Sequence, residues 1–141
     1  MLGRRPVPVL ISVLAVALVV LAAGCGPSST KPYTAKGTVA CLAGKGFKNI
    51  TSDPLKIGLI AGVAEHGGIR AEAPSGNVLT IAFAQNTADA ASTKDAFRAN
   101  ATPFYRRHMA DIMESQRNAV LVWTTSPSLA LLTRVFGCLH A

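Results

Sequence analysis

His108 and Asp111 are the pair of residues in this sequence whose types and spacing come closest to a metal site. Residues three apart on a helix share a face, so the imidazole and the carboxylate can begin a set of metal ligands. A complete site needs three or four convergent ligands, and the fold would have to bring in His66 or His140. The competing interpretation is a solvated helix face that also carries Arg107. We favour the solvated face and keep a metal-dependent enzyme as the alternative.

Other catalytic or cofactor motifs are absent from the sequence, which has no GxSxG elbow, no HExxH pair and no GxxxxGK phosphate loop. The glycines of Lys45-Gly46 and Gly67-Gly68 are explained as helix stops. The pair Gly58 and Gly62 is explained by close packing of a helix on a sheet, and Trp123 as a core or rim aromatic. We therefore expect a non-enzymatic protein without a cofactor.

The first residues form a leader in three parts. Met1–Pro6 carries two arginines and no acid, and Val7–Ala23 is apolar apart from Ser12. Small residues at 22–24 follow. A basic start, an apolar core and a small-residue exit are typical of a secretory signal. The two arginines should stay on the cytoplasmic side, which places everything after the leader outside.

The segment Leu21-Ala22-Ala23-Gly24-Cys25 closes this leader and resembles the lipobox of bacterial lipoprotein precursors. In that family the cysteine is lipidated with fatty-acyl chains such as palmitate and becomes the first residue of the mature protein. Ala22 stands where the family usually has Leu. The resemblance implies a signal peptide at 1–24, lipidation of Cys25 and a location on the outer, extracytoplasmic face of the cell membrane. An uncleaved anchor and ordinary secretion are the alternatives.

Three cysteines, Cys25, Cys41 and Cys138, give an odd count, which in an exported protein leaves one thiol to explain. If Cys25 carries the lipid, the other two are free to pair, because the outer face of the membrane permits disulfides. Such a bridge would contribute about 4–5 kcal/mol in the loop-entropy model. The alternative is two buried free cysteines, which behave as small apolar residues.

The charge balance is basic, with 14 Lys and Arg against 7 Asp and Glu. Removal of Arg4 and Arg5 with the leader leaves twelve cations against seven acids, a balance of +5. The sequence shows no RNP-like aromatics, zinc-finger spacing or basic helix, so we expect no nucleic-acid partner. For an exported protein the charge favours anionic lipid or wall polymer. The expected partners are the membrane, through the lipid anchor, and an envelope protein or anionic envelope component.

The organisation of the chain after the leader is simple. Gly26–Pro32 is polar and buries too little apolar area to fold, so residues 25–35 are expected to form a flexible tether. Residues 36–141 suit a single α+β domain with one core. In composition and layout the chain resembles small lipoproteins of high-GC Gram-positive bacteria, most of which have no assigned activity.

The periodicity predicts eight elements in this domain. Helices are expected at 38–45 (a strand is the alternative), 54–66, 87–116 with a break at Thr102-Pro103, and 126–139; strands are expected at 47–50, 69–73, 78–84 and, centrally, 118–124. The second helix should begin at the cap Asp53 and bury a stripe that includes Leu55, Leu59 and Val63.

The order of the inner six elements, β-α-β-β-α-β, predicts a ferredoxin-like plait with flanking N-terminal and C-terminal helices. A Cys41–Cys138 bridge would join those two flanking helices. The hypothesis for function is a lipid-anchored binding or interaction domain acting through the open sheet face or a basic helix surface. The alternatives are an extracytoplasmic metal-dependent enzyme using His108 and Asp111, and a sensor or solute-binding accessory, which a ligand-sized pocket would favour.

Overall fold

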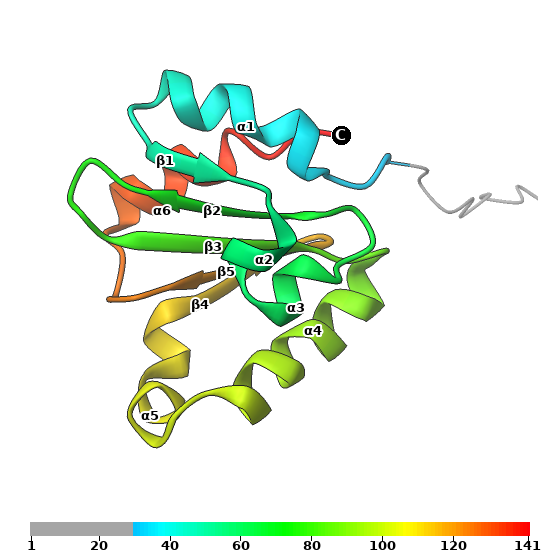
Figure 1. Ribbon diagram of the computed structural model, residues 1–141, viewed down its shortest axis with the longest axis vertical. Coiled ribbons are helices and arrows are strands. Elements are labelled where there is room, and N and C mark those ends of the chain that lie inside the picture. Colours follow the sequence, from blue (N-terminus) through cyan, green and yellow to red (C-terminus); the bar gives the residue numbers. More distant parts are fainter. Residues whose placement is uncertain (1–29) are drawn as a thin grey trace, which may run out of the picture.

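The computed structural model describes residues 30–141, so the predicted signal peptide and Cys25 lie outside the described residues. It shows a mixed α+β fold with a five-stranded sheet and six helices (Figure 1). Within 30–141 there is no helix long and apolar enough to cross a membrane. The elements in chain order are α1 (Ala35–Gly44), β1 (Lys48–Thr51), α2 (Pro54–Ile57), α3 (Leu59–Gly62), β2 (Gly68–Glu72), β3 (Val78–Phe83), α4 (Thr87–Asn100), α5 (Pro103–Ile112), β4 (Met113–Gln116), β5 (Ala119–Trp123) and α6 (Leu129–Phe136).

The strands are ordered β1-β2-β3-β5-β4, and all neighbouring pairs are antiparallel. The ferredoxin-like plait is therefore not confirmed. A split β-α-β unit encloses one strand between two parallel ones, whereas here β1 lies at an edge and pairs only with β2. The central position predicted for 118–124 agrees with the interior place of β5, between β3 and β4.

The connection between β1 and β2 explains this departure. Asp53 caps α2 as predicted, its side chain accepting a hydrogen bond from the Leu55 backbone N–H at 3.1 Å. The helix then stops at Gly58, whose φ of 86° is readily adopted only by glycine. The predicted helix over 54–66 is thus wrong in extent, because the chain turns and forms the separate short helix α3. This turn lets β2 return antiparallel beside β1.

The turn at Gly58 also changes which side chains are buried. Ile57 and Ala61 are buried, whereas Leu55 is 94% exposed. Leu59 and Val63 are exposed as well, so the predicted apolar stripe is wrong. A continuous helix would place residues four apart on one face, but the break resets the helical phase between the two pieces.

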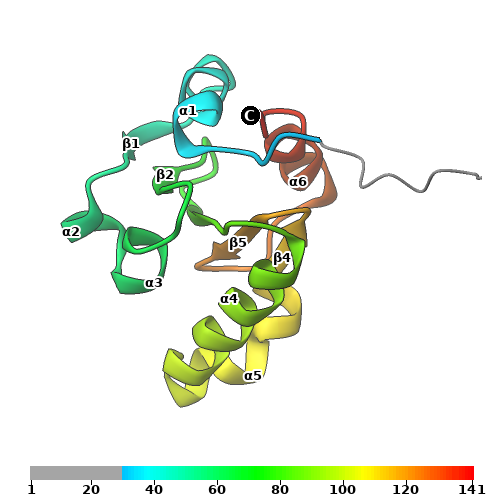
Figure 2. The same cartoon turned by 90° about the vertical axis from the view of Figure 1, so that its right-hand side faces the viewer.

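Most of the core lies on one face of the sheet, which we call the closed face. Strand β3 buries Leu79, Ile81 and Phe83 there, and their register partners on β5, which include Leu121 and Trp123, are buried on the same face. Helices α1 and α6 lie over this side (Figure 2). Buried side chains from both helices and from the C-terminal segment belong to the same apolar cluster: Leu42, Val135, Cys138 and Leu139.

The long helical region ends earlier than predicted. The break at Thr102 and Pro103 is confirmed, since α4 ends at Asn100 and α5 begins at Pro103. Residues 113–116 were expected to be helical but form β4, which pairs with β5 along its whole length. This non-local pairing overrides a locally helical composition. The last helix likewise begins at Leu129, where Ser128 supplies the cap, and not at 126.

The turn between β4 and β5 holds the N-terminal segment against the domain. The buried Asn118 side chain accepts a hydrogen bond from the Tyr33 backbone N–H at 2.8 Å and donates to the carbonyl oxygens of Tyr33 and Ala84. The Arg117 guanidinium lies 4.2 Å from the centre of the Tyr33 ring. Residues 33 and 34 of the predicted tether therefore contact the domain, and α1 begins at Ala35.

Candidate functional site

His108 and Asp111 do share a face of α5, as their spacing predicts. The His108 Nδ1 atom lies 4.0 Å from the Asp111 carboxylate, and both side chains are more than half exposed. The described part of the chain contains no group of three or more His, Cys, Asp or Glu side chains able to hold a metal ion. The fold thus leaves the predicted pair without a third ligand, and His66 and His140 do not complete it.

Ser126 lies beside this pair, in a small pocket of about 230 Å³ that His108 and Asp111 also line. A hydrolytic triad requires the serine hydroxyl to donate to the imidazole. Here the Ser126 hydroxyl instead donates to the backbone carbonyl of Asp111 at 3.2 Å. Ser126, His108 and Asp111 therefore lie together, but the serine hydroxyl bonds to the backbone near the end of α5 and not to the imidazole.

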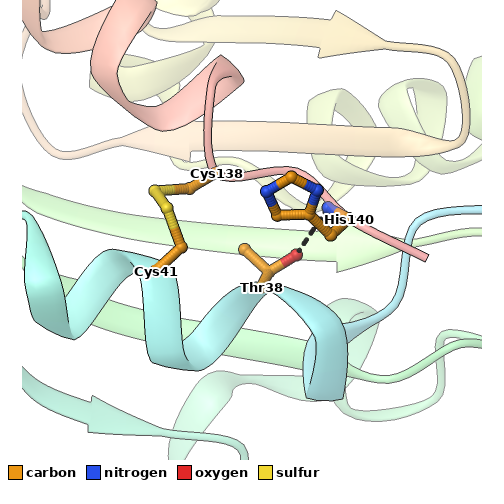
Figure 3. The surroundings of a disulfide bond; sticks show 4 residues. All are labelled: Thr38, Cys41, Cys138 and His140. Carbon is orange, nitrogen blue, oxygen red and sulfur yellow. Dashed lines mark hydrogen bonds between the residues drawn. A yellow bond between two sulfur atoms is a disulfide. The ribbon is translucent and has the colours of Figure 1, made fainter.

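The predicted pairing of Cys41 with Cys138 is confirmed (Figure 3). The two Cα atoms are 5.3 Å apart, inside the usual range for a disulfide, and the bond joins α1 to the segment after α6. Beside it, the His140 backbone N–H donates to the Thr38 hydroxyl at 3.4 Å. A Cβ on Gly37 would lie only 2.7 Å from the Ala141 carbonyl oxygen, so α1 and the C-terminal segment pack closely. The disulfide therefore holds the C-terminal segment against α1 on the closed face.

The opposite face of the sheet is only partly covered. At one end the small residues Gly68 and Ala82 let α3 approach the strands, since a Cβ on Gly68 would lie 2.5 Å from the Ala61 carbonyl oxygen. One row along, Arg70, Thr80 and Val122 are register neighbours on β2, β3 and β5. Arg70 is exposed and the other two are half-buried. Helix α3 therefore covers the row that contains Gly68 and Ala82 but not the row that contains Arg70.

A groove of about 350 Å³ occupies this uncovered area, and we call it the open-face groove. Its floor includes Thr80 and Val122, and its walls come from α3 and from the region where α4 meets α5. Apolar wall residues are Ile60, Phe97, Ala101 and Met109. The break at Thr102-Pro103 turns α5 away from α4, and residues on both sides of the break line the groove.

The lining of the open-face groove carries charge of one sign. Of the described residues that line it, none is a carboxylate and one, Arg70, is a cation. Glu72 lies two residues further along β2, outside the lining, and its carboxylate accepts a hydrogen bond from the Asn49 side-chain amide at 2.8 Å. The groove is therefore mostly apolar, with neutral polar side chains in its lining and one positive side chain at its β2 side.

The open sheet face is one of the binding surfaces predicted from the sequence, but no motif locates this groove on it. Trp123 is predicted to be a core or rim aromatic; it is 1% exposed, and it also lines the groove. Thr80 and Val122 look like ordinary alternating strand residues, and only the sheet order reveals that they adjoin each other and Arg70. The predicted helix break was the nearest available signal, since it marks the place where the wall bends.

Comparison of the chain with protein-family models, with curated proteins and with solved structures found no match. The open-face groove and the leader are the features of this protein that bear on its function.

Proposed function

We propose that this protein is a lipid-anchored, non-enzymatic binding domain on the outer face of the cell membrane, and that the open-face groove is its binding site. The groove is the observation that carries the proposal. A concave, mostly apolar site with a few polar side chains is the usual form of a small-molecule site, and such sites measure about 300–1,000 Å³. At about 350 Å³ the groove is of ligand size.

The lipid anchor rests on the leader and its resemblance to the lipobox. A basic start, an apolar core and small residues before Cys25 support export and lipidation. A diacylated cysteine would provide the two acyl chains that firm membrane binding requires. The Cys41–Cys138 disulfide is consistent with an oxidising compartment such as the outer face.

The intact mass of the membrane-extracted protein tests the anchor. We expect a chain that begins at an acylated Cys25 and gains two hydrogens on reduction, because the remaining cysteines are paired. A mass that still includes Met1, or an unmodified Cys25, would contradict lipidation and leave a transmembrane anchor or secretion.

The groove is tested by a neutral apolar dye, N-phenylnaphthylamine, which fluoresces strongly only in an apolar environment. We expect its fluorescence to rise on addition of the wild-type domain and to stay low with Thr80→Phe, which fills the floor of the groove. Phenylalanine is favourable in strands, so the sheet should tolerate it.

Thr133→Phe is the matched control, since Thr133 is exposed on α6, away from the groove. Equal dye fluorescence from Thr80→Phe and Thr133→Phe would mean that the groove is not the binding site. Circular dichroism of each variant verifies that it is folded.

A further inference from the structure

We propose that the occupant of the open-face groove is a single-chain fatty acid, with its hydrocarbon chain along the groove and its carboxylate on Arg70. This inference rests on the proposed function and names the ligand class of the same site. The lining of the groove, its charge, its size and the apolar residues around it all suit this ligand.

The lining suits a hydrocarbon chain. Val122 on the floor and Phe97, Ala101 and Met109 on the walls present carbon atoms to the groove. Burial of methylene groups against such a surface contributes about 0.8 kcal/mol each, and a methionine side chain adapts readily to a flexible chain. Neutral polar side chains also line the groove and could bond to a head group: Thr80, Asn100, Thr102, Tyr105 and Thr124.

The charge of the groove selects the head group. Arg70 has no ion-pair partner among the described residues, although the carboxylate of Glu72 is two residues away on the same strand. The guanidinium offers a planar fork of donors that matches a carboxylate in a bidentate pair. Because the lining holds no acid, an anionic head group meets attraction and a cationic one meets repulsion.

The size favours one hydrocarbon chain over the two of a phospholipid, and the single cation favours a carboxylate over a phosphate monoester. A volume of about 350 Å³ lies at the lower end of ligand sites, which suits one chain and not two. One arginine balances the single charge of a carboxylate, whereas a single-chain alkyl phosphate is a monoester that carries nearly two charges at neutral pH.

Exposed apolar side chains continue outward from both walls. On one side Ile60 is shared with a neighbouring pocket that Leu59 and Val63 also line, and both of these are more than 70% exposed. On the other side Tyr105 adjoins Phe104, which is 63% exposed. These exposed apolar side chains extend the apolar surface of the groove to the outside of the domain. This surface would let the groove take a fatty acid from the surface of a bilayer.

Isothermal titration calorimetry with three dodecyl probes of matched chain length tests the inference. The probes are dodecanoate, dodecanol and dodecyltrimethylammonium, each below the concentration at which it self-associates. We expect dodecanoate to bind tightest. Arg70→Gln should weaken dodecanoate binding about threefold to tenfold, from the upper part of the range for exposed charge pairs to the lower end for hydrogen bonds to charged groups, and leave dodecanol binding unchanged.

Lys45→Gln is the matched control, because it removes one positive charge from the exposed end of α1 without touching the groove. It should bind dodecanoate as the wild type does. Thr80→Phe should lose all three probes while keeping the wild-type circular dichroism spectrum.

Two results would overturn the inference and leave the proposed function standing. One is equal affinity for the three probes, with no effect of Arg70→Gln. The other is tighter binding of dodecyl phosphate than of dodecanoate, which would assign the groove to a phosphate head group. Failure of every probe, including N-phenylnaphthylamine, would remove both the inference and the proposed function.

Discussion

At the scale of single residues, burial in this protein depends on which face of each short helix meets the sheet. Ile57 and Leu55 are two positions apart in the same short helix, yet the first is 4% exposed and the second 94%. The sequence could predict that an apolar stripe exists in this region. It could not predict the stripe's direction, because Gly58 ends α2 and the tertiary contacts of Ala61 then orient α3.

Alanine substitutions at these two positions should therefore differ sharply. Ile57→Ala should lower the free energy of unfolding by about 2–4 kcal/mol, because it leaves a cavity between α2 and the sheet. Leu55→Ala, the matched control, should change it by less than about 0.5 kcal/mol. Urea unfolding of both variants measures the difference. A larger loss for Leu55→Ala than for Ile57→Ala would mean that the continuous predicted stripe, and not the broken helix, describes this region.

At the scale of elements, two local signals in the sequence were confirmed, whereas the pairing of the strands was not predicted. Asp53 and the Thr102-Pro103 break acted where they were predicted to act, since capping and proline effects need only neighbouring residues. Strand β4 was missed because Met113–Gln116 becomes extended only through its ladder with β5. The predicted order of elements along the chain fitted the plait, but it could not specify the observed strand order β1-β2-β3-β5-β4.

The open-face groove could not be predicted for a related reason. It exists where helices do not cover the sheet, and Gly68 is the residue that decides how closely α3 approaches. No pattern within a strand reveals which part of its face a helix leaves uncovered.

Gly68→Ala tests this packing at the element scale. The added Cβ would lie 2.5 Å from the Ala61 carbonyl oxygen, a contact the backbone can relieve only by moving α3 from the sheet. We expect a loss of about 1–3 kcal/mol in the free energy of unfolding, as for other overpacked sites.

Gly44→Ala is its control, since a Cβ there meets nothing within 4 Å. It should be neutral or stabilise α1 by up to about 1 kcal/mol. If Gly68→Ala unfolds at the same urea concentration as Gly44→Ala, α3 does not pack as tightly as the structure shows.

At the scale of the whole molecule, the two faces of the sheet have different characters. The closed face is covered by α1 and α6, and the Cys41–Cys138 disulfide ties α1 to the chain after α6 (Figures 2 and 3). The opposite face is covered at one end and hollowed at the other. A rigid, cross-linked side behind an accessible groove suits a domain whose role is to hold a ligand.

Reduction of the disulfide should lower stability without removing the fold's core contacts. The bond spans 97 residues, and the loop-entropy model gives a loss of about 4–5 kcal/mol when a loop near that length is opened. Urea unfolding with and without a reductant measures it, and a Cys41→Ser/Cys138→Ser double variant should match the reduced protein. An unchanged midpoint on reduction would show that the bond contributes nothing to stability.

The most direct test of the account is to map dodecanoate binding onto the domain by two-dimensional NMR of its backbone amides. The groove assignment predicts the largest shift changes at Arg70, Thr80, Ala101 and Val122, with the closed-face amides of Leu42 and Val135 unmoved. Shift changes centred on α1 and α6, or around His108 and Asp111, would contradict the assignment and place the binding site elsewhere on the molecule.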